Sequence, residues 1–551
     1  MNSQTIRKAF ICIAVIAATQ LMSCHEIETP MDETDKEEVI DTLQNDNEKE
    51  EVVPSPVFPQ SIVILDKEVT IKPGYTANIE FRVNPSNADV DFKSFNLDLI
   101  STDTRLVSYI TEPVNLKLKS IKYSQENKLN LRGQYTMTIE DKNLSTDYCE
   151  RVAIVYKTKN EAGLTMEISS DVITVTPEYP SELPRVYITT PGGAKINSKT
   201  EWMEDSNILI VDKDGNESLN ASTSIRGRGN STWTYPKKPY ALKLDSKAEV
   251  LGMPKHKRWV LLANWMDRTL MRNDVAFEMG RRLMNWAPRG EFVELYLNGI
   301  HQGNYYLCEQ IKPDKNRVDI DDDGYILEFD VYGPNDEINY FYTPVKNYPV
   351  TIKEPDEEVI TSWDHPKFLS IADYTGNIED LLEADKEEHA RWSEVEALID
   401  VKSYIDWWFI HEMTLNFEPN HPKSCYMHKH SEGKLYAGPV WDFDWGTYGV
   451  HTNDMAIPES LWYGYLLKYP EFQAAAKARW AEVKDTFLDI ETYISETAAM
   501  IEASNEVNIY KWPLDTSTNG DEKLSFEKAV KSMKDSYMSR ISAMDNYLSK
   551  F

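Results

Sequence analysis

The apolar pattern of this chain changes at a proline-rich stretch, TPEYPSELP, at residues 176–184. Before this stretch, apolar and polar residues alternate in short runs that turn residues separate. After it, runs with a period of two mix with runs of helical spacing, and helical spacing dominates toward the C-terminus. One hydrophobic core does not serve 551 residues, because domains usually hold about 100–200. The proline-rich stretch is therefore predicted to join two separately folded parts.

Residues 58–178 are predicted to form a β-sandwich. Runs such as ANIEFRV, YTMTIE and RVAIVYKT place apolar side chains on one face of a strand. Several such strands with turn residues between them are typical of immunoglobulin-like (Ig-like) domains. This part lacks the Cys…Trp…Cys pattern of a true immunoglobulin domain, so the prediction concerns the architecture alone.

Residues 185–551 are predicted to form an α+β domain. The run NDVAFEMGRRLM has the apolar spacing of a helix. The run EFVELYLNG followed by QGNYYLCEQI indicates a hairpin that turns at Asn298 and Gly299. Beyond Ala456, YPEFQAAAKARWAEVKDTF and KLSFEKAVKSMKDSYMSRISAMDNYLSK are predicted to be amphipathic helices that pack against the rest.

The first residues are predicted to be an export signal. Arg7 and Lys8 precede an apolar stretch that is shorter than the roughly 20 residues needed to cross a bilayer. The following Leu-Met-Ser-Cys is typical of a bacterial lipobox, so residues 1–23 are interpreted as a lipoprotein signal peptide and Cys24 as the lipidation site. Residues 24–57 are acidic and poor in aromatic residues, which predicts a disordered tether. The expected location is the cell envelope, at the outer membrane or the cell surface, through a lipid anchor on Cys24.

The formal net charge of the chain is −31 at pH 7, which argues against nucleic acid as a partner. Apart from Cys24 and the signal, the chain has three cysteines: Cys149, Cys308 and Cys425. Their odd number and wide spacing predict buried thiols rather than a disulfide framework.

One basic stretch contrasts with this acidic background: SIRGRGNSTWTYPKKPYALKL, at residues 224–244. Glycines let backbone N–H groups close around an anion while Arg and Lys side chains supply charge, so a phosphate site is one interpretation. A hairpin with a solvated basic face is the other. Lys243 falls on the predicted strand YALKL, where a lysine taken alone is most often simply solvated.

The stretch WDFDWG, at residues 441–446, carries two carboxylates between aromatic residues. On an extended segment Asp442 and Asp444 point to one side and Phe443 to the other. Such carboxylates are costly to bury without a partner, and a Mg²⁺ ion that carries nucleotide phosphates would be one. The alternative is that they cap neighbouring backbone groups or pair with arginines.

Several motifs occur together in one order: SIRGRGNSTW, YALKL, LLANWMDRTLMRND, GNYYLCEQIK, GYILEFD, HEMTLN and GPVWDFDWG. In this combination, residues of about 185 to 540 resemble the spore coat protein H (CotH) kinase family. The resemblance implies an atypical, protein-kinase-like bilobal domain. It also implies ATP- and Mg²⁺-dependent transfer of phosphate to Ser or Thr of a protein substrate or envelope partner.

The resemblance further implies roles for individual residues. Lys243 is expected to bind ATP phosphates and Glu278 to pair with it, while Asp442 and Asp444 match the metal-binding DFD of the family. Asn264 and Asp267 belong to the family's ANxxDxxxxRN run. The remaining residues expected to bind nucleotide are those of the glycine-containing loop and of a hinge at CEQI: Arg226, Arg228, Asn230, Ser231, Glu309 and Ile311.

Glu418 marks a departure from the family pattern. Many members place an Asp after HEMTLN as the catalytic base, whereas this chain reads NFEPNHP. A glutamate is one methylene longer and can still accept a hydroxyl proton, so Glu418 is the predicted base. The main alternative function is a non-catalytic surface lipoprotein of the same fold that binds a glycan or a partner protein through aromatic faces.

Two other candidate metal sites match their usual sequence patterns less well than WDFDWG does. One is a zinc site from residues that cluster in sequence but match no common zinc-finger spacing: His411, His421, Cys425, His428 and His430. The other is a Ca²⁺ loop in DIDDDGYILEFD, at residues 319–330. Its twelfth residue is Asp330 rather than Glu, and YILEFD is typical of a strand, so an acidic hairpin is favoured.

Overall fold

The computed structural model describes residues 55–72, 75–104, 126–140, 148–336, 339–449, 454–513 and 519–551. The predicted signal peptide, Cys24 and nearly all of the predicted tether lie outside these ranges. Within these ranges, no helix is both long enough and apolar enough to span a membrane. The combination of sheets and helices confirms the predicted α+β class.

The residues before the proline-rich joint form two sheets. One has the order β1-β3-β6-β5 and the other the order β2-β9-β7-β4, with β8 added to β7. Alternate side chains of both sheets, such as Phe81 and Ile154, meet in one apolar core. The Ig-like assignment of this part stays a prediction. The strands are β1 (Ser61–Ile64), β2 (Glu68–Ile71), β3 (Thr76–Asn84), β4 (Phe95–Thr104), β5 (Glu126–Leu131), β6 (Gln134–Glu140), β7 (Tyr148–Lys159), β8 (Thr165–Ser169) and β9 (Ile173–Pro177).

Seven strands after the joint close into a barrel in the order β10-β11-β12-β13-β14-β16-β15. Parallel pairing of β10 with β15 completes the ring. Leu242 and Trp259 fill the interior, whereas Val260 and Cys308 face outward into a second core. The predicted hairpin is confirmed, because β15 and β16 pair across Asn298 and Gly299, which have φ of 51° and 73°. The strands are β10 (Arg185–Thr189), β11 (Met203–Val211), β12 (Glu217–Gly227), β13 (Tyr240–Val250), β14 (Met253–Leu262), β15 (Gly290–Leu297) and β16 (Ile300–Glu309).

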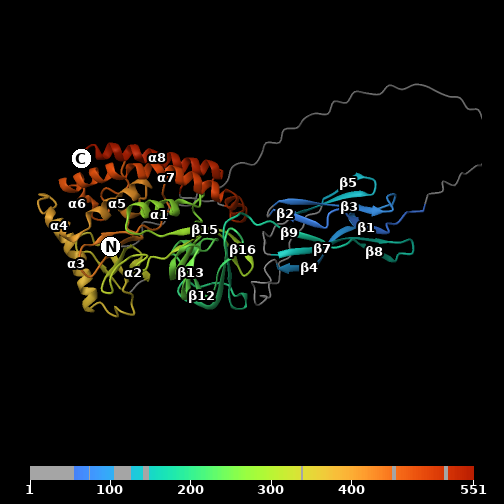
Figure 1. Cartoon of the computed structure of the whole chain (residues 1–551), viewed down its shortest axis with the longest axis horizontal. Helices are drawn as coiled ribbons and strands as arrows, with labels where there is room; N and C mark the ends of the chain where they lie inside the picture. The colour runs from blue at the N-terminus through green and yellow to red at the C-terminus, as the bar shows by residue number, and fades with distance from the viewer. Residues whose placement is uncertain are drawn as a thin grey trace, which may run out of the picture. The chain divides into compact units, whose positions relative to one another are not determined.

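A further sheet and the helices share that second core. The sheet has the order β18-β19-β17-β20-β21. Its strands are β17 (Tyr325–Phe329), β18 (Tyr340–Tyr342), β19 (Pro349–Glu354), β20 (Cys425–Lys429) and β21 (Tyr436–Ala437). The helices are α1 (Arg272–Leu283), α2 (Gly333–Asp336), α3 (Pro366–Ala384), α4 (Trp392–Leu398), α5 (Val401–Met413), α6 (Tyr463–Leu466), α7 (Pro470–Lys511) and α8 (Phe526–Leu548). The two predicted C-terminal helices are α7 and α8, which lie side by side (Figure 1).

The segment before α1 is a compact loop. Asn264 and Leu270 have positive φ angles of 46° and 62°, and the Asn264 side chain donates to the Leu270 carbonyl at 2.8 Å. The helix therefore begins at Arg272. Cys149, Cys308 and Cys425 are free thiols; Cys308 and Cys425 are buried as predicted, whereas Cys149 is partly exposed.

Candidate functional site

The WDFDWG segment places its two aspartates together. Phe443 is fully buried in the second core, Asp444 is nearly buried, and Asp442 stays partly exposed. A hydrogen bond joins the two carboxyl groups. Asp442 has a φ of 67°, a conformation that non-glycine residues rarely adopt and that clusters at functional sites.

Side chains from two distant segments hold this backbone in place. The Phe443 N–H donates to Asn273 Oδ1 at 2.7 Å, and Asn273 in turn donates to Asn264 Oδ1 at 3.0 Å. The Asn519 side chain donates to the Asp444 carbonyl at 3.0 Å. The ANxxDxxxxRN run therefore positions the aspartate pair from α1 and the loop before it.

A second group of charges lies behind this run, and we call it the Arg272 network: Asp267, Arg272 and Asp521. Arg272 Nε donates to Asp267 at 3.0 Å and its Nη2 donates to Asp521 at 2.6 Å. Asp267 also accepts from the N–H groups of Thr269 and Arg272. Arg272 also donates to the carbonyl of Thr447, which lies just beyond WDFDWG.

Three more carboxylates surround the aspartate pair, and the five together form the carboxylate cluster: Glu328, Asp330, Glu418, Asp442 and Asp444. Burial, and then the Asp442 carboxylate, raise the pKa of Glu418 to about 8. Burial, and then Glu328, raise the pKa of Asp330 to about 6. Burial raises the pKa of Asp442 and, together with the Asp442 carboxylate, raises the pKa of Asp444 well above its usual range. The cluster thus carries more negative charge than its surroundings compensate.

Three cations reach the cluster, and one of them is Lys353, whose Nζ lies 3.2 Å from Glu328 Oε2. Arg228 acts electrostatically on Asp442, and its guanidinium lies 5.2 Å from the centroid of the Trp441 ring. Lys423 Nζ lies 3.6 Å from Glu418 Oε1. All three cations oppose the rise in the carboxyl pKa values, since a positive charge favours the ionised form. The basic stretch at 224–244 therefore meets WDFDWG through Arg228.

The other predicted loop residues point elsewhere. Arg226 donates to the Thr200 carbonyl at 3.0 Å and lies over the Trp202 ring. Asn230 accepts from Lys199 at 3.0 Å, and Ser231 directly precedes a short 3-10 helix, Thr232–Thr234. Both glycines are required by the loop. A Cβ at Gly227 would lie 2.3 Å from the Trp233 ring, and Gly229 has a φ of 81°.

The predicted pair of Lys243 and Glu278 does not form. Lys243 is exposed on the outer face of β13, between the inward-facing Leu242 and Leu244. Glu278 instead binds Arg281 and Arg282 of its own helix, each at 2.7 Å. The prediction of this ion pair was wrong because helix neighbours three and four residues away compete for the carboxylate.

At the predicted hinge, Glu309 faces away from the cluster. Its carboxylate is fully buried and accepts from Arg289 at 2.8 Å, with Arg317 at 3.6 Å. Cys308 has the opposite orientation on β16, and its thiol lies within the electrostatic reach of Arg228. Ile311 is partly buried against the second core.

Sequence reasoning did not place Glu328, Asp330 or Lys423 beside Asp442, and it considered Asp330 only as the last residue of a Ca²⁺ loop. Glu328 and Asp330 lie at and just after the end of β17, within the GYILEFD motif. Acidic residues at the end of a buried strand were the available signal, but only folding brings them to Asp442.

The rival metal sites are not assembled. Across the described ranges, no three His, Cys, Asp or Glu side chains are arranged so that they alone hold a metal ion. His411 packs between Trp407 and Phe443, and Asp321 accepts from Ser431, 110 residues further along the chain. The predicted acidic hairpin at 319–330 is wrong, because β17 pairs with the distant strands β19 and β20. Mg²⁺ usually needs only one or two protein carboxylates, because phosphates and water complete its shell. The Asp442 and Asp444 pair, with raised pKa values and an excess of negative charge, fits such an ion.

Comparison with known proteins identifies a family. The family model described as "CotH kinase protein" matches residues 225–544, more than half of the chain. No curated protein matches.

Similar solved structures include the titin M3 domain, with 14% identity and a TM-score of 0.12, covering 23% of this chain and 98% of that one. They also include domains 5-6 of the S-layer protein SbsC, with 14% identity, a TM-score of 0.14, and 45% and 96% of the two chains covered. A marsupial T cell receptor has 12% identity, a TM-score of 0.18, and 37% and 96% covered. At these TM-scores the likenesses carry no argument about the fold.

Proposed function

Because the chain belongs to the CotH kinase family, we propose that it is an atypical, kinase-like bilobal protein kinase that transfers phosphate from ATP to protein Ser or Thr. The observation that carries the proposal is that Arg228, from the basic glycine loop, meets Asp442 of WDFDWG, and that Asp442 in turn lies close to Glu418. These groups come from segments roughly 200 residues apart in the chain, and they combine phosphate-binding, metal-binding and proton-accepting chemistry in one place.

In this proposal each group has one task. Asp442 and Asp444 would hold Mg²⁺, which when bound neutralises phosphate charge. Arg228 would bind phosphate oxygens. Lys243, exposed on the outer face of the neighbouring strand β13, would contribute a second positive charge. Asn273 and Asn519 keep the aspartate pair in position, because they hold its backbone from both sides.

Glu418 would take the proton of the acceptor hydroxyl. A base must be ionised to do so, whereas burial and Asp442 raise its pKa to about 8. Lys423 favours the ionised form, and so would a cation at Asp442 and Asp444. We therefore expect Glu418 to ionise at neutral pH once the cation is in place.

The proposed location is the cell envelope, with Cys24 as lipid anchor and residues 24–57 as tether. If so, Cys24→Ala releases the protein from the membrane fraction. A variant that fractionates like the parent contradicts this location.

The test of the kinase proposal is incubation of the purified chain with radiolabelled ATP and Mg²⁺, with the chain itself and added proteins as acceptors. The proposal is supported if the parent chain transfers label to an acceptor and the Asp442→Asn variant does not. Absence of transfer with every acceptor and metal overturns it and favours the non-catalytic binding module. A thermal-shift scan then separates the two, since stabilisation by glycans but not by ATP and Mg²⁺ is expected only of the binding module.

A further inference from the structure

A cavity of about 560 Å³ lies between the barrel and the helical part. Its walls are the connection from α1 to β15, the segment that follows β16, the first turn of α5 and the β20–β21 hairpin. A volume of this size is ordinary for small-molecule sites, which occupy roughly 300–1,000 Å³.

This cavity is separate from the carboxylate cluster. None of the five carboxylates lines it. Cys308 and Glu309 are neighbours on β16 and point to opposite faces, Cys308 toward Arg228 and Glu309 toward Arg289 and Arg317 of the cavity. The cavity therefore lies on the other side of the hinge strand from the proposed phosphate site.

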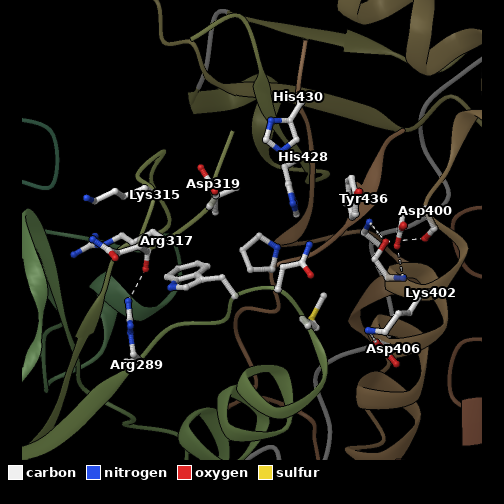
Figure 2. A pocket seen from close by; sticks show the side chains of 18 residues that line it. Arg289, Lys315, Arg317, Asp319, Asp400, Lys402, Asp406, His428, His430 and Tyr436 are labelled. Atoms are coloured by element: carbon white, nitrogen blue, oxygen red, sulfur yellow. Dashed lines mark hydrogen bonds and ion pairs between the residues drawn. The ribbon is translucent and has the colours of Figure 1, made fainter. Parts of the chain in front are cut away.

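One wall of the cavity is cationic. Figure 2 shows Arg289, Lys315 and Arg317 together on this side, with the single carboxylate of Asp319 beside them. Glu309 is the carboxylate that two of them share. Lys315 is exposed and has no ion pair with any residue that the structure describes. Arg317 is only 3% exposed, yet its Nη2 has no hydrogen-bond acceptor in the described part of the chain. This wall therefore has hydrogen-bond donors that could bind an anion.

The opposite wall combines acceptors with an aromatic face. Asp400, Lys402, Asp406 and Tyr436 lie on this side (Figure 2). Asp406 is compensated, since it accepts from Lys402 and Arg479, each at 2.8 Å. Asp400 uses Oδ1 to cap α5 through the Ser403 N–H at 2.8 Å, which leaves Oδ2 as an acceptor.

The aromatic face comes from Tyr436 and His428. Their rings stack with centroids 5.3 Å apart. His428 Nδ1 lies 2.9 Å from the Gly438 carbonyl, and burial lowers the His428 pKa to about 4. The ring is therefore neutral, Nδ1 donates to Gly438, and Nε2 is an acceptor that no residue described by the structure bonds. Acceptors beside an aromatic face are suited to ring compounds with several hydroxyl groups.

We propose that this cavity binds a sugar that carries an anionic group, as a sugar phosphate or a uronic acid does. The anionic group lies against Lys315 and Arg289, the hydroxyls donate to Asp400 and His428, and the ring stacks on Tyr436. A neutral sugar leaves the cationic wall unmatched, and inorganic phosphate leaves the acceptor wall unmatched. This site does not depend on the proposed kinase activity.

Calorimetric titration of the full chain with glucose 6-phosphate and with glucuronate tests the proposal. At least one of them is expected to bind about tenfold more tightly than glucose and than inorganic phosphate. Which of the two binds more tightly identifies the source of the anion. Lack of saturable binding of both, or equal affinity for glucose, overturns the proposal.

Two variants locate the binding. Lys315→Glu is expected to weaken the preferred ligand about tenfold or more, because it reverses a charge on the cationic wall. Tyr436→Ala is expected to weaken it about tenfold through loss of stacking. Lys255→Glu is the matched control, since Lys255 is equally exposed on β14 outside the cavity. Asp442→Asn is a second control and leaves sugar binding unchanged. If Lys315→Glu keeps the parent's melting temperature and affinity, or if Asp442→Asn abolishes binding, the assignment is wrong.

Discussion

The Arg272 network and the carboxylate cluster are two neighbouring groups of buried charge that differ in how fully ion pairs and hydrogen bonds satisfy their carboxylates. In the network, Arg272 binds Asp267 and Asp521, and backbone N–H groups satisfy Asp267 as well. In the cluster, five carboxylates face three cations, Arg228, Lys353 and Lys423, and burial with mutual repulsion raises the pKa values of Glu418 and Asp444. Removing the cation from a fully bonded group leaves buried charge unpaired and destabilises the fold, whereas a group with excess carboxylates is suited to binding a cation or substrate.

The largest expected effect is that of Asp442→Asn. It removes a metal ligand, so Mg²⁺-dependent nucleotide binding and phosphate transfer are expected to be lost, as measured by titration and by radiolabel. Without Mg²⁺, the same change should raise stability by about 1 kcal/mol, because it removes one of five repelling carboxylates. A stability loss instead would mean that the cluster is a structural group like the Arg272 network.

The carboxylate cluster also makes the stability of the fold depend on pH. The folded pKa values of Asp330 and Glu418 are about 6 and about 8, above their ordinary values, so the folded chain binds more protons than the unfolded chain. Their contribution to stability is present at low pH and is lost as the pH rises through 6 to 8. Asp442→Asn should flatten this slope in thermal unfolding without Mg²⁺.

Glu418→Gln is expected to lower kcat by about 10²–10⁴ and to leave nucleotide binding nearly intact, because a glutamine has a similar shape but accepts no proton. The measurement is steady-state transfer beside ATP titration. Glu418→Asp is the matched variant, since it keeps the charge and should retain part of the activity. An active enzyme in which Glu418→Gln is silent would place the base elsewhere, with Asp444 as the next candidate.

Arg272→Met is expected to destabilise the fold by about 3–5 kcal/mol, because Asp267 and Asp521 would stay buried without their cation. Chemical denaturation measures this loss. Arg282→Met, on the same helix but partly exposed, is the control and should cost less than about 1 kcal/mol. Equal costs for the two variants would remove the distinction between the network and ordinary ion pairs.

The smallest expected effect is that of His411. This side chain is buried in its neutral form, whereas the carboxylates of the Arg272 network are buried in ion pairs. Burial lowers its pKa to about 3, so below pH 6.5 the unfolded chain binds a proton that the folded chain does not. Stability therefore falls on acidification, by about 2 kcal/mol between pH 7 and pH 5 for this group. His411→Phe should remove that loss, as followed by denaturation at both pH values. His421→Phe, at an exposed position, should leave it unchanged.

Local features of the sequence predicted the elements well. Alternation identified the strands before the joint, Asn298 and Gly299 marked the hairpin, and helical spacing identified α7 and α8. The motifs resembling the CotH family were matched by the family model over residues 225–544. Each of these features depends on residues that are close together in the chain. Their side-chain periodicity and backbone preferences determine the local secondary structure directly.

Contacts between distant segments were decided by the tertiary structure. The sequence indicated that Asp442 and Asp444 share one side, but only folding added Glu328 and Asp330 to them. The cavity behind β16 likewise joins Lys315 to Tyr436 across more than a hundred residues. A carboxylate selects its partner by distance and burial, and the packing of the barrel against the helices sets both.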